Sequence, residues 1–340
     1  MRLPWQKQRT GDIYAVVEEQ RRLLLEGEQA TVRHLLASYR EAQRGIEAEL
    51  NRVLARLLKA QTDGTEINQA WLFQHGRLSE LLAEVEARIA KFSGKAEAIT
   101  TAQQALNVIR ATNATGAIMG AAGVKSGFVM LHRDAFEDVV GFLSDGSPLH
   151  KIFKDLSPDA VDAARRAFAH SMVLGRNPRV TGRIIQETVD DAVNMSRNRA
   201  VLIARTETMR AYRTATLRNY ANNPGIVQGW RWLSGRDGRC CPICIAMDGS
   251  THKLDEPFAS HPGCRCSAVP VLAEGIDTDI GTGDEWLTGQ DEETQLSVLG
   301  ASRLKLWQDG DASLDDMVED TFSNQWGAGK KLKPLRDLRN

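Results

Sequence analysis

The stretches Asp237-Gly-Arg-Cys-Cys-Pro-Ile-Cys244 and His261-Pro-Gly-Cys-Arg-Cys266 together hold all five cysteines of this 340-residue chain. Two thiols separated by two residues, as in Cys241 and Cys244, can reach one tetrahedral Zn²⁺ from a single tight turn. The second stretch supplies further nitrogen and sulfur donors, so the two stretches predict a metal-binding module over residues 230–270. Because most of these donors are thiols, we expect a closed, structural Zn²⁺ site.

Six side chains compete for the four positions around such an ion. Cys241 and Cys244 form the first pair, and two of the remaining candidates complete the site: His261, Cys264 and Cys266, with Cys240 as a sixth candidate. A set of reduced, buried cysteines without metal is the alternative. A redox dithiol is disfavoured because no alternating strands and helices surround the pair. The clustering of an odd number of cysteines in a long chain indicates a reducing compartment rather than a secreted disulfide scaffold.

The N-terminal third of the chain has the pattern of long helices. From Asp12 to about Lys59, apolar residues recur in alternating steps of three and four, which predicts one helix with a coiled-coil-like seam. The seam residues are Val32, Leu35, Tyr39, Ala42, Ile46, Leu50, Val53 and Leu57. Residues 62–65 predict a turn, and a second amphipathic run continues through Phe92. We therefore predict a helical hairpin in which each helix buries one stripe.

Together these patterns predict a mainly α fold. The expected architecture is a long N-terminal helical hairpin, a helical middle and a small α+β zinc-binding module near the C-terminal third. Four segments are expected: 1–112, the coiled-coil-like helices; 113–156, a glycine-rich connection; 157–270, a domain that carries the zinc module at 230–270; and 271–340, an acidic segment with a basic tip.

Composition and charge exclude several classes of protein. The formal net charge is −1, so no overall field would draw the chain to nucleic acid or to an anionic membrane. No run of 18 apolar residues is present, which argues against a spanning helix. The N-terminus Met1–Lys7 carries charge where a secretory signal peptide needs an apolar h-region, which argues against such a peptide. Residues 271–340 carry 15 acidic and 7 basic side chains, which predicts an interaction surface or a solvated acidic face.

One helical stretch is rich in arginine. Between Arg197 and Arg218 there is a single acidic residue, Glu207, and six arginines: Arg197, Arg199, Arg205, Arg210, Arg213 and Arg218. A helical face with so many arginines predicts a binding surface for phosphates or for an acidic partner. The alternative is a solvated face with internal arginine–glutamate pairs.

Several motifs carry a family resemblance. Ala204-Arg-Thr-Glu207 is followed by Trp232, by the Asp237–Cys244 turn, by Met247-Asp-Gly249 and by the closing stretch His261–Cys266. In order and spacing they resemble the phage Mu protein F-like family of minor head, or head morphogenesis, proteins, over residues from about 160 to 270. The acidic tail also resembles such proteins at Trp286, Gln290 and Trp307. Cys240 departs from the family pattern.

The resemblance implies a structural role in the virion without a catalytic site. Proteins of this kind associate with the portal during capsid assembly, contact other capsid proteins and are linked to DNA packaging or delivery. The implied location is the capsid interior or portal region of the virion, and the host cytoplasm during assembly. DNA is an implied further partner; no membrane or small-molecule substrate is expected.

A zinc-dependent nuclease or hydrolase acting on DNA is the alternative function. A catalytic zinc keeps an open position and needs a nearby general base. The candidates for such roles are Asp237, Asp248, His252 and His261. Against this alternative, the thiol-rich donor set favours a closed site.

Overall fold

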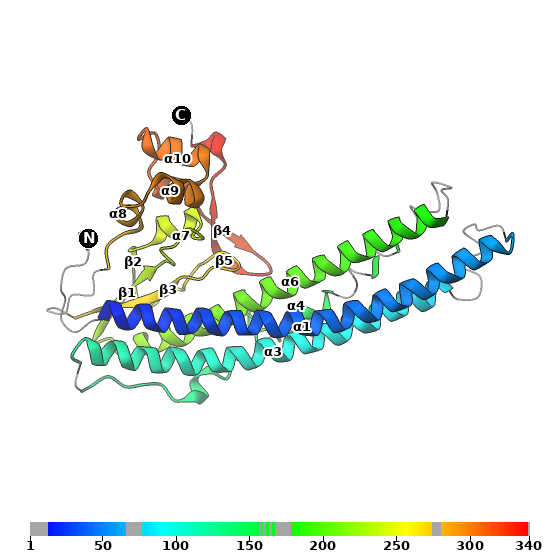
Figure 1. Cartoon of the computed structure of the whole chain (residues 1–340). Coiled ribbons are helices and arrows are strands. Elements are labelled where there is room, and N and C mark those ends of the chain that lie inside the picture. The colour runs from blue at the N-terminus through cyan, green and yellow to red at the C-terminus, as the bar shows by residue number, and fades with distance from the viewer. Residues whose placement is uncertain are drawn as a thin grey trace. The chain divides into compact units, whose positions relative to one another are not determined.

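The computed structural model describes residues 13–65, 77–124, 126–156, 158, 161–162, 165–166, 178–273 and 280–338. Helices dominate, and the strands lie in the C-terminal third (Figure 1), which confirms the predicted fold class. The chain divides into two compact units. Unit 1 comprises Met1–Glu28, Gln103–Gly146 and Arg205–Asn340, and unit 2 comprises Gln29–Ala102 and Ser147–Ala204. None of the described helices is both long and apolar enough to cross a membrane.

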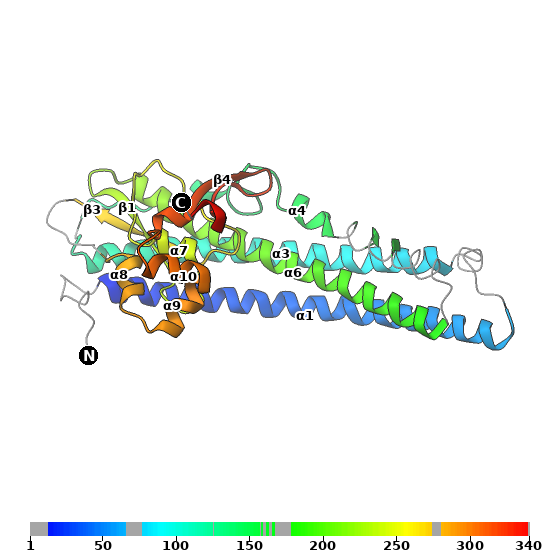
Figure 2. The ribbon, with the colours of Figure 1, turned by 90° about the horizontal axis from the view of Figure 1, so that it is seen from above.

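Three long helices contribute to both units. They are α1 (Ile13–Thr62), α3 (Arg77–Ala121) and α6 (Pro178–Ala221), and Figure 2 shows all three along their length. The predicted first helix, Asp12 to about Lys59, is therefore found almost in full. The arginine-rich helical stretch from Arg197 to Arg218 lies within the longer helix α6.

Unit 2 is built from the middle and end of α1, the first half of α3 and the first half of α6. The predicted seam of α1 is its buried stripe, with Leu35, Tyr39, Ala42, Ile46, Leu50 and Val53 all at most 6% exposed. Val32 is half-buried, and the side chain of Leu57 lies outside the described set. The Tyr39 ring packs edge-on against Phe92 of α3 at 5.7 Å, and its hydroxyl donates to Asn194 of α6 at 3.0 Å. The seam thus holds three helices together.

Helix α3 extends further than the sequence predicted. The glycine-rich connection was expected from residue 113, but the helix continues through Gly116 and Gly120 to Ala121. Ala111, Ala114 and Ile118 are buried there, and their packing offsets the roughly 1 kcal/mol that a glycine costs in a helix. The helix ends where Gly123 takes a positive φ of 76° and the Val124 amide donates to the Met119 carbonyl at 3.0 Å.

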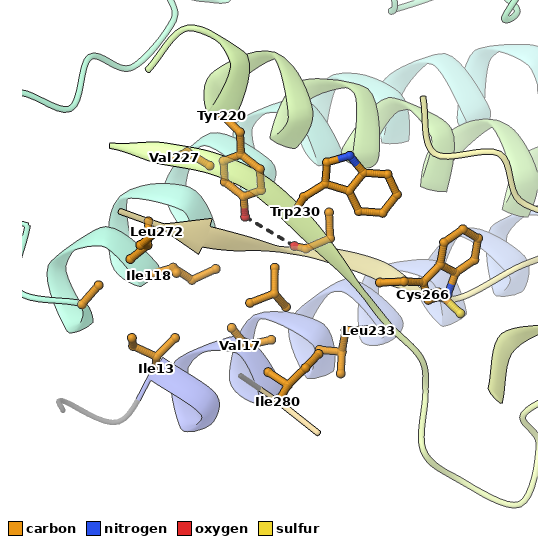
Figure 3. Close-up of a cluster of buried hydrophobic side chains, with 14 of the residues drawn as sticks. Ile13, Val17, Ile118, Tyr220, Val227, Trp230, Leu233, Cys266, Leu272 and Ile280 are labelled. Atoms are coloured by element: carbon orange, nitrogen blue, oxygen red, sulfur yellow. Dashed lines mark hydrogen bonds between the residues drawn. The ribbon is translucent and has the colours of Figure 1, made fainter. Parts of the chain in front are cut away.

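Unit 1 contains a three-stranded antiparallel sheet of order β2-β1-β3. Its strands are β1 (Val227–Leu233), β2 (Thr251–His252) and β3 (Ser267–Leu272), and the short helix α7 (Pro242–Met247) lies between β1 and β2 in the chain. Figure 3 shows the core around β1, in which Val17 of α1, Ile118 of α3 and Tyr220 of α6 surround the strand. The Tyr220 hydroxyl donates to the Ala268 carbonyl at 3.4 Å.

The C-terminal segment folds onto α7. Helices α8 (Gly283–Thr288), α9 (Glu292–Leu299) and α10 (Ala301–Gln308) precede a hairpin of β4 (Val318–Ser323) and β5 (Gly327–Leu332). Ile245 of α7 is buried with Trp286, Leu299 and Met317 in one apolar cluster. Within the hairpin, Lys330 pairs with Asp320 at 2.6 Å and Lys331 with Glu319 at 3.0 Å, so part of the basic tip neutralises the acidic segment.

Short helical turns complete the described elements. They are η2 (Arg133–Phe136), α4 (His150–Lys154), η3 (Asp315–Met317) and η4 (Leu335–Asp337). Phe136 and Val139 cover part of α6 by packing in a cluster with Met209 and Tyr212.

Candidate metal centre

The first half of the cluster is formed by the start of α7. Cys241 has the extended backbone of an N-cap residue (φ −90°, ψ 161°), and Pro242 occupies the first helical position. This turn brings the two thiols of the Cys-x-x-Cys pair together, with the Sγ atoms of Cys241 and Cys244 3.4 Å apart. Two sulfur donors therefore face one point from a single turn, as the spacing predicted.

The loop before β3 supplies the second half. His261 Nε2 lies 3.2 Å from the Sγ atoms of both Cys241 and Cys244. The Sγ atom of Cys264 lies 3.8 Å from that of Cys244. Ligand atoms around a tetrahedral zinc with bonds of 2.0–2.3 Å are separated by about 3.5–3.7 Å. The observed separations are close to these values, and the cluster could hold a metal ion.

The orientation of His261 suits a ligand. Its Nδ1 lies 2.8 Å from the Pro262 carbonyl oxygen, so Nδ1–H donates to that carbonyl. Nε2 is then the ring nitrogen that faces both thiols. A backbone carbonyl that fixes the ring in this way is the usual outer partner of a metal-binding histidine.

Cys266 and Cys240 occupy different positions relative to this centre. The Sγ atom of Cys266 groups with those of Cys244 and Cys264 within 4.8 Å, whereas His261 groups with Cys241 and Cys244. Cys240 points elsewhere, into the apolar cluster of Trp286 and Leu287. Burial raises the pKa of the Cys240 thiol, which suits an apolar packing role.

The pKa shifts divide the thiols of the cluster: hydrogen bonds with Cys241 and Cys264 raise the pKa of Cys244 well above its usual value, whereas Cys241 and Cys264 are shifted toward the thiolate. Hydrogen bonding from Cys244, reinforced by His261 against the effect of burial, lowers the pKa of Cys241 to about 4. Burial alone would raise the pKa of Cys264, yet hydrogen bonds from Cys244 and Cys266 hold it well below its usual range. Thiolate, not thiol, is the form that binds metal.

Helix α6 anchors the second loop. The Gly263 amide donates to Thr206 Oγ1 at 3.0 Å, and the Arg213 guanidinium donates to the Cys264 carbonyl at 2.7 Å. Sequence reasoning gave Arg213 only as one member of a basic face and assigned Thr206 no role. The motif Ala204–Glu207 was the one available signal, because it occurs together with the cysteine stretches.

Asp237 and Asp248, the carboxylates considered for catalysis, are engaged in ion pairs. Asp237 accepts two bonds from Arg265 at 3.0 and 3.1 Å. Asp248 accepts from the Ser234 amide and from Arg236 Nε, both at 2.7 Å. Neither is part of the cluster of thiols and imidazole. Their contacts indicate that they frame the module.

His252 also lies outside the cluster. Its ring stacks on Trp230 at 4.1 Å, with Nε2 2.9 Å from Ser250 Oγ and Nδ1 3.0 Å from Glu256 Oε2. This chain of groups has the order of a hydrolase triad, but the Ser250 hydroxyl donates to the Met247 carbonyl at 2.5 Å. A cleft of about 850 Å³ in unit 1 is lined by Glu256 but by neither Ser250 nor His252, nor by any cysteine.

Most of the six arginines between Arg197 and Arg218 of α6 have partners within the chain. Arg205 pairs with Glu28 at 2.7 Å, and Arg218 pairs with Asp138 at 2.6 Å. Arg210 pairs with Glu207 and donates to the Phe142 carbonyl. Arg213 is buried, Arg197 lies 5.3 Å from the Tyr39 ring centroid, and Arg199 is also bonded. These contacts favour internal pairing; a phosphate-binding role for this face stays a prediction.

Comparison with known proteins identifies the segment that carries the cluster. Residues 162–269 match the family described as Phage Mu protein F like protein. The match ends within β3 and includes both cysteine stretches, and it confirms the resemblance seen in the motifs. No curated protein and no solved structure matches the chain.

Proposed function

Because residues 162–269 carry a domain of the phage Mu protein F-like head morphogenesis family, we propose that this chain is a minor head protein. It acts as a portal-associated structural component of the capsid, in head assembly and in DNA packaging or delivery. Its partners are the portal protein, other capsid proteins and DNA. Its location is the capsid interior or portal region of the virion, and the host cytoplasm during assembly. The family match is the observation that carries this proposal.

The metal belongs to the same proposal. Cys241, Cys244, His261 and Cys264 hold a structural Zn²⁺, which would cross-link the start of α7 to the loop before β3. Three observations support this set: the separations of 3.2–3.8 Å, the orientation of His261 by Pro262, and the lowered pKa of Cys241. Cys264 is preferred to Cys266 because it is also hydrogen-bonded to His261.

A structural role fits the chemistry of the site better than hydrolysis. Three thiolates and an imidazole fill four positions, whereas a catalytic zinc keeps one open for water. Asp237 and Asp248 are held by arginines, as described above. Cleavage of DNA by the purified protein, dependent on its zinc, would contradict the structural assignment and favour a zinc-dependent nuclease.

The zinc assignment predicts about one equivalent of zinc in protein purified without added metal. Cys244→Ser removes the thiol closest to the other donors and should abolish zinc retention in elemental analysis. Cys240→Ser is the matched control, because Cys240 lies outside the cluster and the variant should keep its zinc. Full zinc content in Cys244→Ser would refute the assignment.

The assembly role is tested by photo-crosslinking in phage heads. A photoreactive residue placed at Phe322, which is 73% exposed, or at Ile109, which is 49% exposed, should link the chain to the portal or to another head protein. The same residue at buried Leu24 is the control that should give no intermolecular product. Absence of the chain from purified heads would contradict the proposal.

A further inference from the structure

Arg213 is a buried cation that faces the loop of the metal centre. It is 5% exposed, and its Nε and Nη2 donate to the carbonyls of Cys266 and Cys264 at 2.9 and 2.7 Å. Its Nη1 donates to Ser260 Oγ at 2.8 Å, and its Cζ lies 4.5 Å from the Phe258 ring centroid. Neutral groups thus satisfy the hydrogen bonding of the guanidinium, but none of them balances its charge.

The neighbouring arginines of α6 are balanced by carboxylates. Arg205 has Glu28, Arg210 has Glu207 and Arg218 has Asp138. Across the part of the chain that the structure describes, no carboxylate forms an ion pair with Arg213. A buried charge without a counter-charge is strongly destabilising, so negative charge must come from another source.

The cluster of thiols is that source. Both cysteine carbonyls that bind Arg213 belong to residues of the cluster, Cys264 and Cys266, which are buried at 2% and 1% exposure. A divalent ion bound by three thiolates and one neutral imidazole leaves one net negative charge. One guanidinium cation balances that charge.

We propose that Arg213 is the counter-cation and positioning residue of the metal centre. Its charge compensates the loaded, thiolate-rich site, and its forked hydrogen bonds hold the backbone from Cys264 to Cys266 so that the Cys264 thiol faces Cys244. This inference rests on the proposed zinc site and deepens it, since it makes the packing of α6 and the retention of metal energetically coupled.

Arginine is suited to this position for two reasons. Its planar fork donates to two carbonyls at once, and it stays charged when buried. Lysine would supply the charge from a single point but not the fork, and methionine would supply an uncharged stem of similar length. The two substitutions therefore separate charge from geometry.

The experiment measures zinc release from the zinc-loaded, full-length protein to an excess of a colorimetric chelator. Arg213→Met should release zinc about 10–100-fold faster than the wild type, the range seen when outer partners of metal ligands are removed. The zinc release rate of Arg213→Lys should lie between those of Arg213→Met and the wild type. Arg218→Met is the control, because Arg218 lies on the same helix and pairs with the exposed carboxylate of Asp138 outside the module; its release rate should equal that of the wild type.

Equal acceleration of zinc release in Arg213→Met and Arg213→Lys overturns the counter-charge role. Equal acceleration in Arg218→Met overturns the inference as well, because it shows a general loosening of α6. Wild-type release rates in both Arg213 variants overturn this inference while the zinc site stands, and a wild-type protein that binds no zinc overturns both. If Arg213→Met does not fold, as judged by circular dichroism, Arg213→Lys is compared with Arg218→Met: faster release in Arg213→Lys supports the inference, and equal release overturns it.

Discussion

Asp248 and Arg236 form a buried ion pair beside the metal module. Their side chains are 0% and 4% exposed, and Arg236 Nε donates to Asp248 Oδ2 at 2.7 Å. Asp248 also accepts from the Ser234 amide, which fixes the end of β1 against the turn after α7. Burial raises the pKa of Asp248, while Arg236 opposes that rise. At the scale of single residues, this buried acid–base pair engages Asp248 outside the cluster of thiols and imidazole.

Removing the charge of Asp248 should therefore destabilise unit 1. Asp248→Asn removes the buried carboxylate that pairs with the Arg236 guanidinium, and the expected loss is about 3–5 kcal/mol of unfolding free energy. Asp320→Asn is the matched control: it breaks the Lys330 pair in a hairpin where Asp320 is 82% exposed, at a cost of about 0–1 kcal/mol. Urea unfolding followed by tryptophan fluorescence measures both. Equal losses would show that the Asp248 pair contributes no more than a surface pair.

The element that organises unit 2 is the buried stripe of α1. Its residues recur every three or four positions and contact α3 and α6 through Tyr39, as described above. Polar contacts flank this stripe, since Lys91 and Lys95 of α3 both bond to Glu41 of α1. Apolar burial thus stabilises the packing of the three helices. The ion pairs help to fix the position of α3 along α1.

The buried stripe predicts a position-dependent effect of one substitution. Leu50→Asp places a charge where the native side chain is 1% exposed, and should cost about 3–5 kcal/mol because that charge has no partner. Leu58→Asp makes the same change two turns later, where Leu58 is 41% exposed. Its free energy of unfolding should stay within about 0.5 kcal/mol of that of the wild type. Thermal unfolding followed by helical circular dichroism compares them. Similar stabilities of the two variants would show that the stripe is not a packing surface.

The pairing of Glu41 predicts an acid-dependent stability. Hydrogen bonds from Lys95 and Lys91 lower the pKa of Glu41 from 4.5 to about 2 in the folded chain. A carboxylate with a depressed folded pKa stabilises the fold above its unfolded pKa, and that contribution is lost as the pH falls from about 4.5 to about 2. Glu41→Gln should therefore unfold with a weaker pH dependence across that window than the wild type. Identical slopes in the two proteins would contradict the pairing.

At the scale of the whole molecule, three helices serve two compact units. The metal centre is confined to unit 1, where α6 holds the loop of residues 261–266 and α7 holds the Cys-x-x-Cys turn. The family match covers both of these parts together with the strands between them. The short strands of this module share one apolar core, which includes Trp230, Trp232 and Leu272.

The sequence by itself determined the periodic elements and the set of candidate donors for a metal. Heptad-like spacing in α1 and the Cys-x-x-Cys turn of α7 are local features, since both depend on residues within one or two turns of each other. The family resemblance also followed from motifs in order along the chain. Only the tertiary structure decided the course of α3 beyond residue 113, because burial of Ala111, Ala114 and Ile118 outweighs the cost of its glycines. Only the tertiary structure showed that Cys240 lies outside the cluster, that Asp248 forms an ion pair with Arg236, and that Arg213 is buried against the loop of Cys264 and Cys266. Those outcomes depend on contacts between residues 12 to 53 positions apart, and a side chain's partner at that distance is set by packing rather than by its neighbours in sequence.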